Sequence, residues 1–107
     1  MVATLDIASK AKLFRGLADP SRLSILEALR DGPLNVGAVV EVTGLSQPNA
    51  SSHLECLFCC GLVDRERDGR FVYYRIRSRQ VHQLLAAGDR ALASAADALD
   101  RCRRYDR

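Results

Sequence analysis

The sequence predicts a mainly α-helical domain with one small β-hairpin, arranged as a winged helix-turn-helix. Three observations support this fold class. Two helical segments are joined by a short turn containing Gly44, the turn pair Asp68-Gly69 separates two β-prone runs, and one long helical stripe fills the C-terminal part. The chain has 107 residues, enough for one domain and too few for two, so residues 1–107 are predicted to form a single domain.

The first two helices are predicted from apolar spacing and from a capping pair. Residues 7–18 place Ile7 and Phe14 on one helical stripe. Asp19 is a suitable N-cap, and Pro20 fits the first helical position, where the amide has no intrahelical partner. We expect the second helix to end at "RDGP" and to bury Leu23, Ile25, Leu26 and Leu29.

The third and fourth helices form the predicted helix-turn-helix. Asn35 can cap a short helix whose valines recur at helical spacing, and Gly44 ends it. Ser46 is the expected N-cap of the next helix, in which Pro48 is tolerated because first-turn amides lack partners. The inward side of this helix should carry Leu54 and Leu57.

A hairpin and a long helix complete the predicted fold. The runs "LVDRER" and "RFVYYRI" flank Asp68-Gly69 and should form two antiparallel strands. The segment "RQVHQLLAAGDRALASAADALDRC" carries one apolar stripe from Val81 to Leu99. So long a stripe exceeds what a small domain can cover. We therefore expect the first and last helices to form a homodimer interface, with packing onto the chain's own domain as the alternative.

The start of the fourth helix and the hairpin are candidates for DNA contact. A recognition helix presents its N-terminal residues to base edges, and asparagine and glutamine can bond adenine. The formal net charge of +3 is modest, but arginines gather in the hairpin, where they could serve as phosphate contacts. A solvated arginine face is the alternative. The candidates are Ser46, Gln47, Asn49, Ser51, Ser52 and His53 on the helix, with Arg65, Arg67 and Arg70 in the hairpin.

Cysteines mark the other end of the same helix. Cys56 and Cys60 are four residues apart and share a helical face, and Cys59 lies close to the same side. Thiolate pairs select soft ions such as Zn(II), Cd(II), Pb(II) or arsenic over Mg(II) and Ca(II). Such a pair is an incomplete ligand set, and Cys102 is the remaining cysteine. Packing as small core residues is the alternative for these thiols.

Three stretches, "LADPSRLSILEAL", "LSQPNASSHLECL" and "GLVDRERDGRFVYYRI", resemble the ArsR/SmtB family of metal-responsive winged-helix repressors. The resemblance implies a homodimer that binds an inverted-repeat operator in double-stranded DNA and releases it when an inducer binds. Within the family, the chain is similar to the cadmium- and lead-sensing CmtR branch. That likeness implies Cd(II) or Pb(II) as inducer, with Zn(II) as a further candidate. The implied ligands are Cys56, Cys60 and a Cys102 from the partner subunit, whereas Cys59 is a departure with an open role.

Other classes of protein fit the sequence less well. An arsenic-, antimony- or redox-responsive repressor could use the same cysteines. A thiol–disulfide enzyme would need a thioredoxin-like βαβ setting around its cysteine pair, which the sequence lacks, so we expect no enzyme activity. The sequence contains no apolar run long enough for a membrane span and no signal-peptide pattern, which predicts a cytoplasmic protein without a membrane partner.

Overall fold

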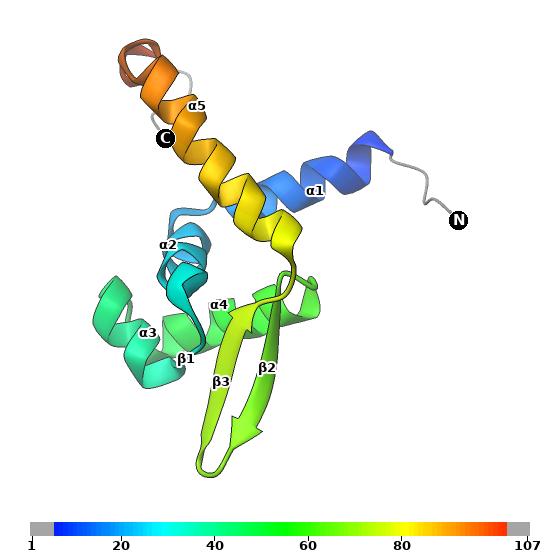
Figure 1. Ribbon diagram of the computed structural model, residues 1–107, viewed down its shortest axis with the longest axis vertical. Helices are drawn as coiled ribbons and strands as arrows, with labels where there is room; N and C mark the ends of the chain where they lie inside the picture. The colour runs from blue at the N-terminus through cyan, green and yellow to red at the C-terminus, as the bar shows by residue number, and fades with distance from the viewer. Residues whose placement is uncertain (1–5, 103–107) are drawn as a thin grey trace.

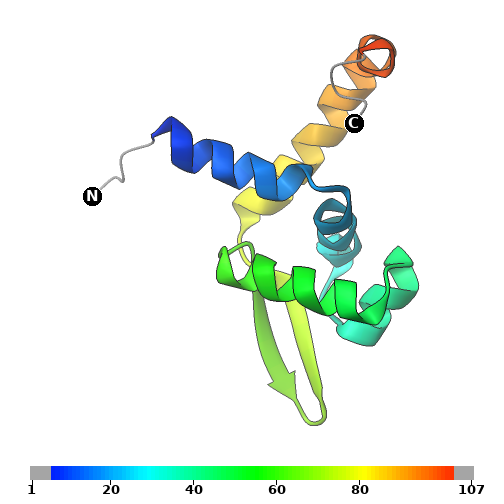
Figure 2. The same ribbon diagram turned by 180° about the vertical axis from the view of Figure 1, so that it is seen from behind.

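The computed structural model describes residues 6–102 and has the predicted winged helix-turn-helix fold. In chain order, the elements are α1 (Ile7–Ala18), α2 (Pro20–Ala28), the 3-10 turn η1 (Leu29–Asp31), β1 (Leu34–Asn35), α3 (Val36–Thr43), α4 (Gln47–Cys59), β2 (Val63–Asp68), β3 (Phe71–Ile76) and α5 (Arg79–Arg101). Figure 1 shows α2, α3 and α4 grouped together, with the β2–β3 hairpin extending away from them. Helices α1 and α5 lie on the opposite side of the molecule from the hairpin tip (Figure 2).

Local capping chemistry sets the helix boundaries where the sequence predicts them. The Asp19 carboxylate accepts from the Arg22 amide at 3.0 Å and begins α2. The Asn35 side chain accepts from the Ala38 amide at 2.8 Å and begins α3. Gly44 ends α3 with φ at 77°, a left-handed conformation that glycine adopts without steric cost.

The sheet contains one strand more than the hairpin that the sequence predicts. Its order is β1-β3-β2, and both strand pairs are antiparallel. β1 has only two residues, too few to show the alternation by which a strand is recognised. In the hairpin, Asp68 pairs with Phe71, so Gly69 and Arg70 form the turn, one residue later than the predicted Asp68-Gly69.

The core lies where α2, α3, α4, the hairpin and the start of α5 meet. Leu23, predicted to be buried with its neighbours, is instead 36% exposed, because the inward side of α2 is centred on Ile25 and Leu26. The buried side chains are Ile25, Leu26, Leu29, Val39, Ala50, Leu54, Leu57, Leu62, Val63, Tyr74, Ile76, Val81 and Leu85. This arrangement fixes α4 against the domain along one face and leaves its other face open.

α5 is divided between two environments. Near its start, Val81 and Leu85 are buried against the chain's own domain. This part of α5 packs in the way that was given above as the alternative to a dimer interface. Farther along, Leu92 is 52% exposed and Leu99 44% exposed, and both views show this half of α5 projecting beyond the other elements (Figures 1 and 2). The apolar stripe therefore packs at one end and stays uncovered at the other.

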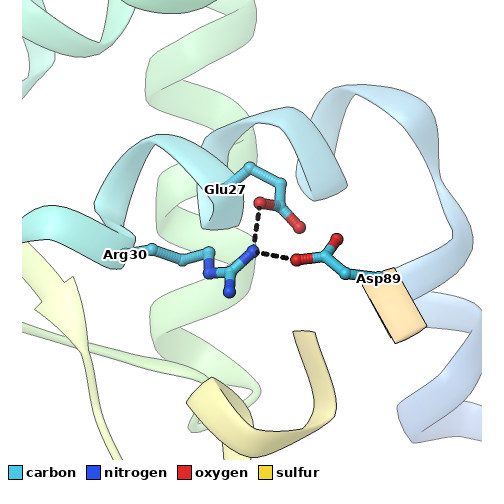
Figure 3. A network of polar contacts seen from close by, with 3 residues as sticks. All are labelled: Glu27, Arg30 and Asp89. Atoms are coloured by element: carbon cyan, nitrogen blue, oxygen red, sulfur yellow. Dashed lines mark hydrogen bonds and ion pairs between the residues drawn. The ribbon is translucent and has the colours of Figure 1, made fainter. Parts of the chain in front are cut away.

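An arginine ties α5 to α2 and η1. Arg30 Nη1 lies 2.9 Å from Glu27 Oε1 and 2.9 Å from Asp89 Oδ2, so one guanidinium joins η1, α2 and α5 (Figure 3). The hydrogen bond to Asp89, followed by the one to Glu27, raises the pKa of Arg30. Among residues 6–102, no helix has the length and apolarity needed to cross a lipid bilayer.

Candidate DNA interface and thiol site

The first turns of α4 present polar side chains to solvent, as predicted. Gln47, Asn49, Ser51 and Ser52 are exposed. The Ser46 hydroxyl accepts from the Asn49 amide at 3.2 Å, so it caps the helix and is also exposed. These side chains can reach a nucleic acid without any rearrangement of the core.

His53 stands apart from the other recognition-helix candidates. His53 is half-buried, whereas the other candidates are exposed, and it lies near Asp19 at the start of α2. The Arg22 amide contributes most to the lowered pKa of the Asp19 carboxyl, and charges on Arg22 and His53 lower it further. His53 therefore borders the α2 side of α4 rather than its open face.

The three hairpin arginines fall into two groups. Arg67 and Arg70 are exposed, and no carboxylate of residues 6–102 lies within ion-pair distance of either one. Arg65 Nη1, in contrast, lies 2.7 Å from Glu55 Oε1, and its guanidinium carbon lies 3.9 Å from the centroid of the Phe58 ring. All three arginines are exposed, and of the three, Arg67 and Arg70 are the ones without a carboxylate partner among residues 6–102.

Cys56 and Cys60 meet in a groove between α1 and the end of α4. The groove has a volume of about 500 Å³, and its walls include Lys12 and Arg22. Burial, and then the neighbouring Cys56 thiol, raise the pKa of Cys60, whereas the charges of Lys12 and Arg22 lower it. The structure therefore places two thiols side by side, and the pKa of Cys60 is raised on balance, although the nearby charges of Lys12 and Arg22 oppose that rise.

The other two cysteines occupy different surroundings. Cys59 also borders the groove, and its thiol donates to Glu55 Oε2 at 3.7 Å, a weak contact. Cys102 follows α5 as its C-cap, and the C-terminal end of that helix lies far from α4 in Figure 1. Within the described part of one chain, no three His, Cys, Asp or Glu side chains come together as a metal-binding group.

Sequence reasoning missed the cationic wall of the thiol groove. Lys12 and Arg15 come from α1, and Arg22 comes from α2. Arg22 Nε donates to the carbonyl of Gly16 at 3.1 Å, which holds the end of α1 against α2. No local sequence pattern predicts that Lys12, Arg15 and Arg22 line the groove, because these side chains lie near the cysteines only when α1 folds over the end of α4.

Comparison with known proteins identifies a family and several relatives. Residues 19–65 match the model described as bacterial regulatory protein, arsR family. A probable mercury resistance operon repressor of Streptomyces lividans is 40% identical over 94 residues, which is 88% of this chain and 75% of that protein. The regulator CmtR of Mycobacterium tuberculosis is 43% identical over 75 residues, covering 70% of this chain and 64% of CmtR, slightly less than two thirds.

A solved structure supports the same relationship. It is the homodimeric winged helix-turn-helix DNA-binding domain of a possible ArsR-family transcriptional regulator from Mycobacterium bovis. Its TM-score to this chain is 0.71 at 32% sequence identity, and the match covers 89% of this chain and 92% of that one.

Proposed function

Because this chain belongs to the ArsR family of bacterial regulatory proteins, we propose that it is a transcriptional repressor that releases its operator when a soft metal ion binds to its cysteine thiolates. The observation that carries the metal half of this proposal is the Cys56–Cys60 pair, set in a groove on the helix that also carries the DNA-facing residues. One rigid helix thus joins the two functions.

The DNA half of the proposal places α4 in the major groove. Gln47, Asn49, Ser51 and Ser52 are its base-reading candidates, since they are exposed on the first turns. Arg67 and Arg70 extend from the hairpin as contacts for phosphates beside the bound groove. His53 is a weaker candidate, because it borders α2.

A homodimer would present two copies of α4 to the two halves of an inverted-repeat operator. Ile7, Phe14, Leu92 and Leu99 support this assembly, because they leave apolar surface uncovered on α1 and on the projecting half of α5. A second copy of the chain could bury both faces at once. The homodimer of the Mycobacterium bovis relative favours the same arrangement.

Cd(II) or Pb(II) is the proposed inducer. Cys56 and Cys60 supply two thiolates, and Cys102 of the partner subunit supplies the third, because the C-terminal end of α5, which Cys102 caps, lies far from α4 of the same chain (Figure 1). Cys59 is a candidate for a further ligand, and Zn(II) is a weaker candidate inducer. A bound ion that ties α5 of one subunit to α4 of the other would shift the two recognition helices relative to each other.

Hg(II) is a second candidate inducer, favoured by a specific observation. Hg(II) forms stable complexes with only two thiolates, and two thiols are what one described chain brings together. The 40% identity to a probable mercury resistance operon repressor points the same way. This candidate makes Cys102 dispensable.

Metal titrations of cysteine variants separate these possibilities. Cd(II), Pb(II) and Hg(II) would each be added to the wild type and to Cys56→Ser, Cys60→Ser, Cys59→Ser and Cys102→Ser, and the thiolate-to-metal absorption band would be recorded. Loss of the band in Cys56→Ser and Cys60→Ser is expected for every ion. Loss in Cys102→Ser for Cd(II) and Pb(II), but not for Hg(II), would support the three-thiolate site.

Two further results would redirect the proposal. Tight As(III) or Sb(III) binding, or an operator response to peroxide without any metal, would indicate the arsenic or redox alternative. A Cys56→Ser, Cys60→Ser, Cys102→Ser triple variant that still responds to these metals would refute the thiolate site altogether.

A further inference from the structure

Arg65 lies on β2 but directs its side chain toward the recognition helix. Side chains alternate along a strand, so Arg65 shares a face with Val63, which is fully buried. The strand register places Arg65 opposite Tyr74, which is also buried. Arg65 is itself exposed, but its guanidinium is engaged by other side chains of the protein and is not free for a phosphate contact.

Two residues one turn apart on α4 hold the Arg65 guanidinium. Glu55 Oε1 accepts from Arg65 Nη1 at 2.7 Å, and the Phe58 ring lies under the guanidinium, 3.9 Å from its carbon to the ring centroid. Tyr74, from the neighbouring strand, and then Glu55 raise the pKa of Arg65. One side chain thus contacts the recognition helix through charge and through an aromatic face, and it contacts both strands of the wing.

The other hairpin ion pairs do not reach α4. Arg75 pairs with Glu66 at 3.2 Å, and Arg77 pairs with Asp64 at 3.7 Å, so both pairs connect β2 with β3 or with the residue that follows it. Of the ion pairs among residues 6–102, the Arg65–Glu55 pair is the one that joins the hairpin to α4. Beyond the buried packing at the base of the hairpin, this ion pair is a direct side-chain link between the wing and α4.

We propose that Arg65 is a positioning residue that fixes the wing against the recognition helix, so that both elements meet the same stretch of operator without reordering. This inference rests on the proposed DNA-binding function and revises the expectation that Arg65 contacts phosphate. A wing that is free to swing would have to be ordered by the DNA, and the apparent affinity would fall by the fraction of molecules in the competent arrangement. Removing one exposed ion pair and one cation–π contact should lower the operator affinity about tenfold.

The test compares Arg65→Gln with Arg70→Gln, a matched loss of one arginine from the same hairpin. Operator affinity would be measured as a function of salt concentration, and circular dichroism would confirm that each variant folds. Arg65→Gln should lower the affinity about tenfold at every salt concentration, with an unchanged salt slope, because no phosphate contact is removed. Arg70→Gln should reduce the slope. A slope that falls equally in both variants would overturn the proposal.

Glu55→Gln provides the sharpest discrimination. If Glu55 were only a negative charge near DNA, its neutralisation would tighten binding. If Glu55 holds Arg65, the same substitution should weaken binding, and Glu55→Gln combined with Arg65→Gln should cost little more than Arg65→Gln alone. Tighter binding by Glu55→Gln, or strictly additive losses in the double variant, would contradict the positioning role.

Hydrogen exchange without DNA separates this inference from the proposed function. Amides of β2 and β3 should exchange faster in Arg65→Gln and Glu55→Gln than in the wild type or in Arg70→Gln, because the wing is released. Unchanged exchange in all three variants would refute the positioning role. Failure of the wild type to bind any operator would refute the proposed function, while the exchange comparison would still decide whether Arg65 holds the wing.

Discussion

Replacing Arg70 by alanine tests the assignment of the wing tip to phosphate contact. Arg70 lies in the two-residue turn between β2 and β3, is exposed, and has no ion-pair partner among residues 6–102, so the substitution removes a charge with little effect on packing. Each phosphate contact contributes about 0.9 to the slope of log affinity against log salt concentration. A dimer carries two wings, so the slope should fall by about 1.8.

The change in slope fixes how the affinity difference between the wild type and Arg70→Ala should vary with salt concentration. Since each contact contributes more at low salt, the ratio of wild-type to Arg70→Ala affinity should shrink by about 12-fold when salt rises from about 50 mM to about 200 mM. Fluorescence anisotropy of a labelled operator would measure both proteins across this range. Arg90→Ala is the control, because Arg90 is exposed on α5, away from the hairpin tip. An unchanged slope in Arg70→Ala would refute the phosphate assignment.

Three further changes test other parts of the structure. Leu54→Ala removes a fully buried side chain of α4 and should lower the free energy of unfolding by about 2–5 kcal/mol, as read from denaturant midpoints. Asp19→Ala removes the N-cap of α2 and should cost about 1 kcal/mol at neutral pH. Folding lowers the pKa of Asp19 below its ordinary 3.8. The stability difference between the wild type and Asp19→Ala should therefore have its full size above that pH, and it should shrink as acid protonates the folded carboxyl. A stability difference that stays constant down to pH 2 would contradict the cap. Leu92→Glu places a charge on the uncovered half of α5 and should shift the protein toward monomer in sedimentation, and an unchanged dimer would place the interface elsewhere.

The parts of the fold that could be predicted from sequence depend on local chemistry. Asp19, Asn35 and Ser46 each cap a helix through an amide three residues ahead, so the signal and its partner lie in one short stretch. Gly44 likewise ends α3 through its own left-handed backbone conformation, so the signal lies in that single residue. The spacing of Cys56 and Cys60 places both on one face of any helix that contains them, and the folded structure brings these two thiols together.

The remaining features depend on contacts between distant parts of the chain. The role of Arg65 depends on the hairpin register and on Glu55 and Phe58, which a count of arginines cannot reveal. Lys12 approaches Cys60 only because α1 folds over the end of α4. Arg103, Arg104 and Arg107, which are close together in the sequence, lie outside the described residues.

Operator affinity measured with and without bound metal is the most direct test of the central claim. The wild type and the Cys56→Ser, Cys60→Ser double variant would be titrated with labelled operator in the absence and in the presence of saturating Cd(II), Pb(II) or Hg(II). We expect that at least one of these ions raises the wild-type dissociation constant about tenfold or more, equivalent to about 1.4 kcal/mol of coupling, and leaves the double variant unchanged. A metal-loaded wild type that binds its operator as tightly as the metal-free protein would contradict this claim.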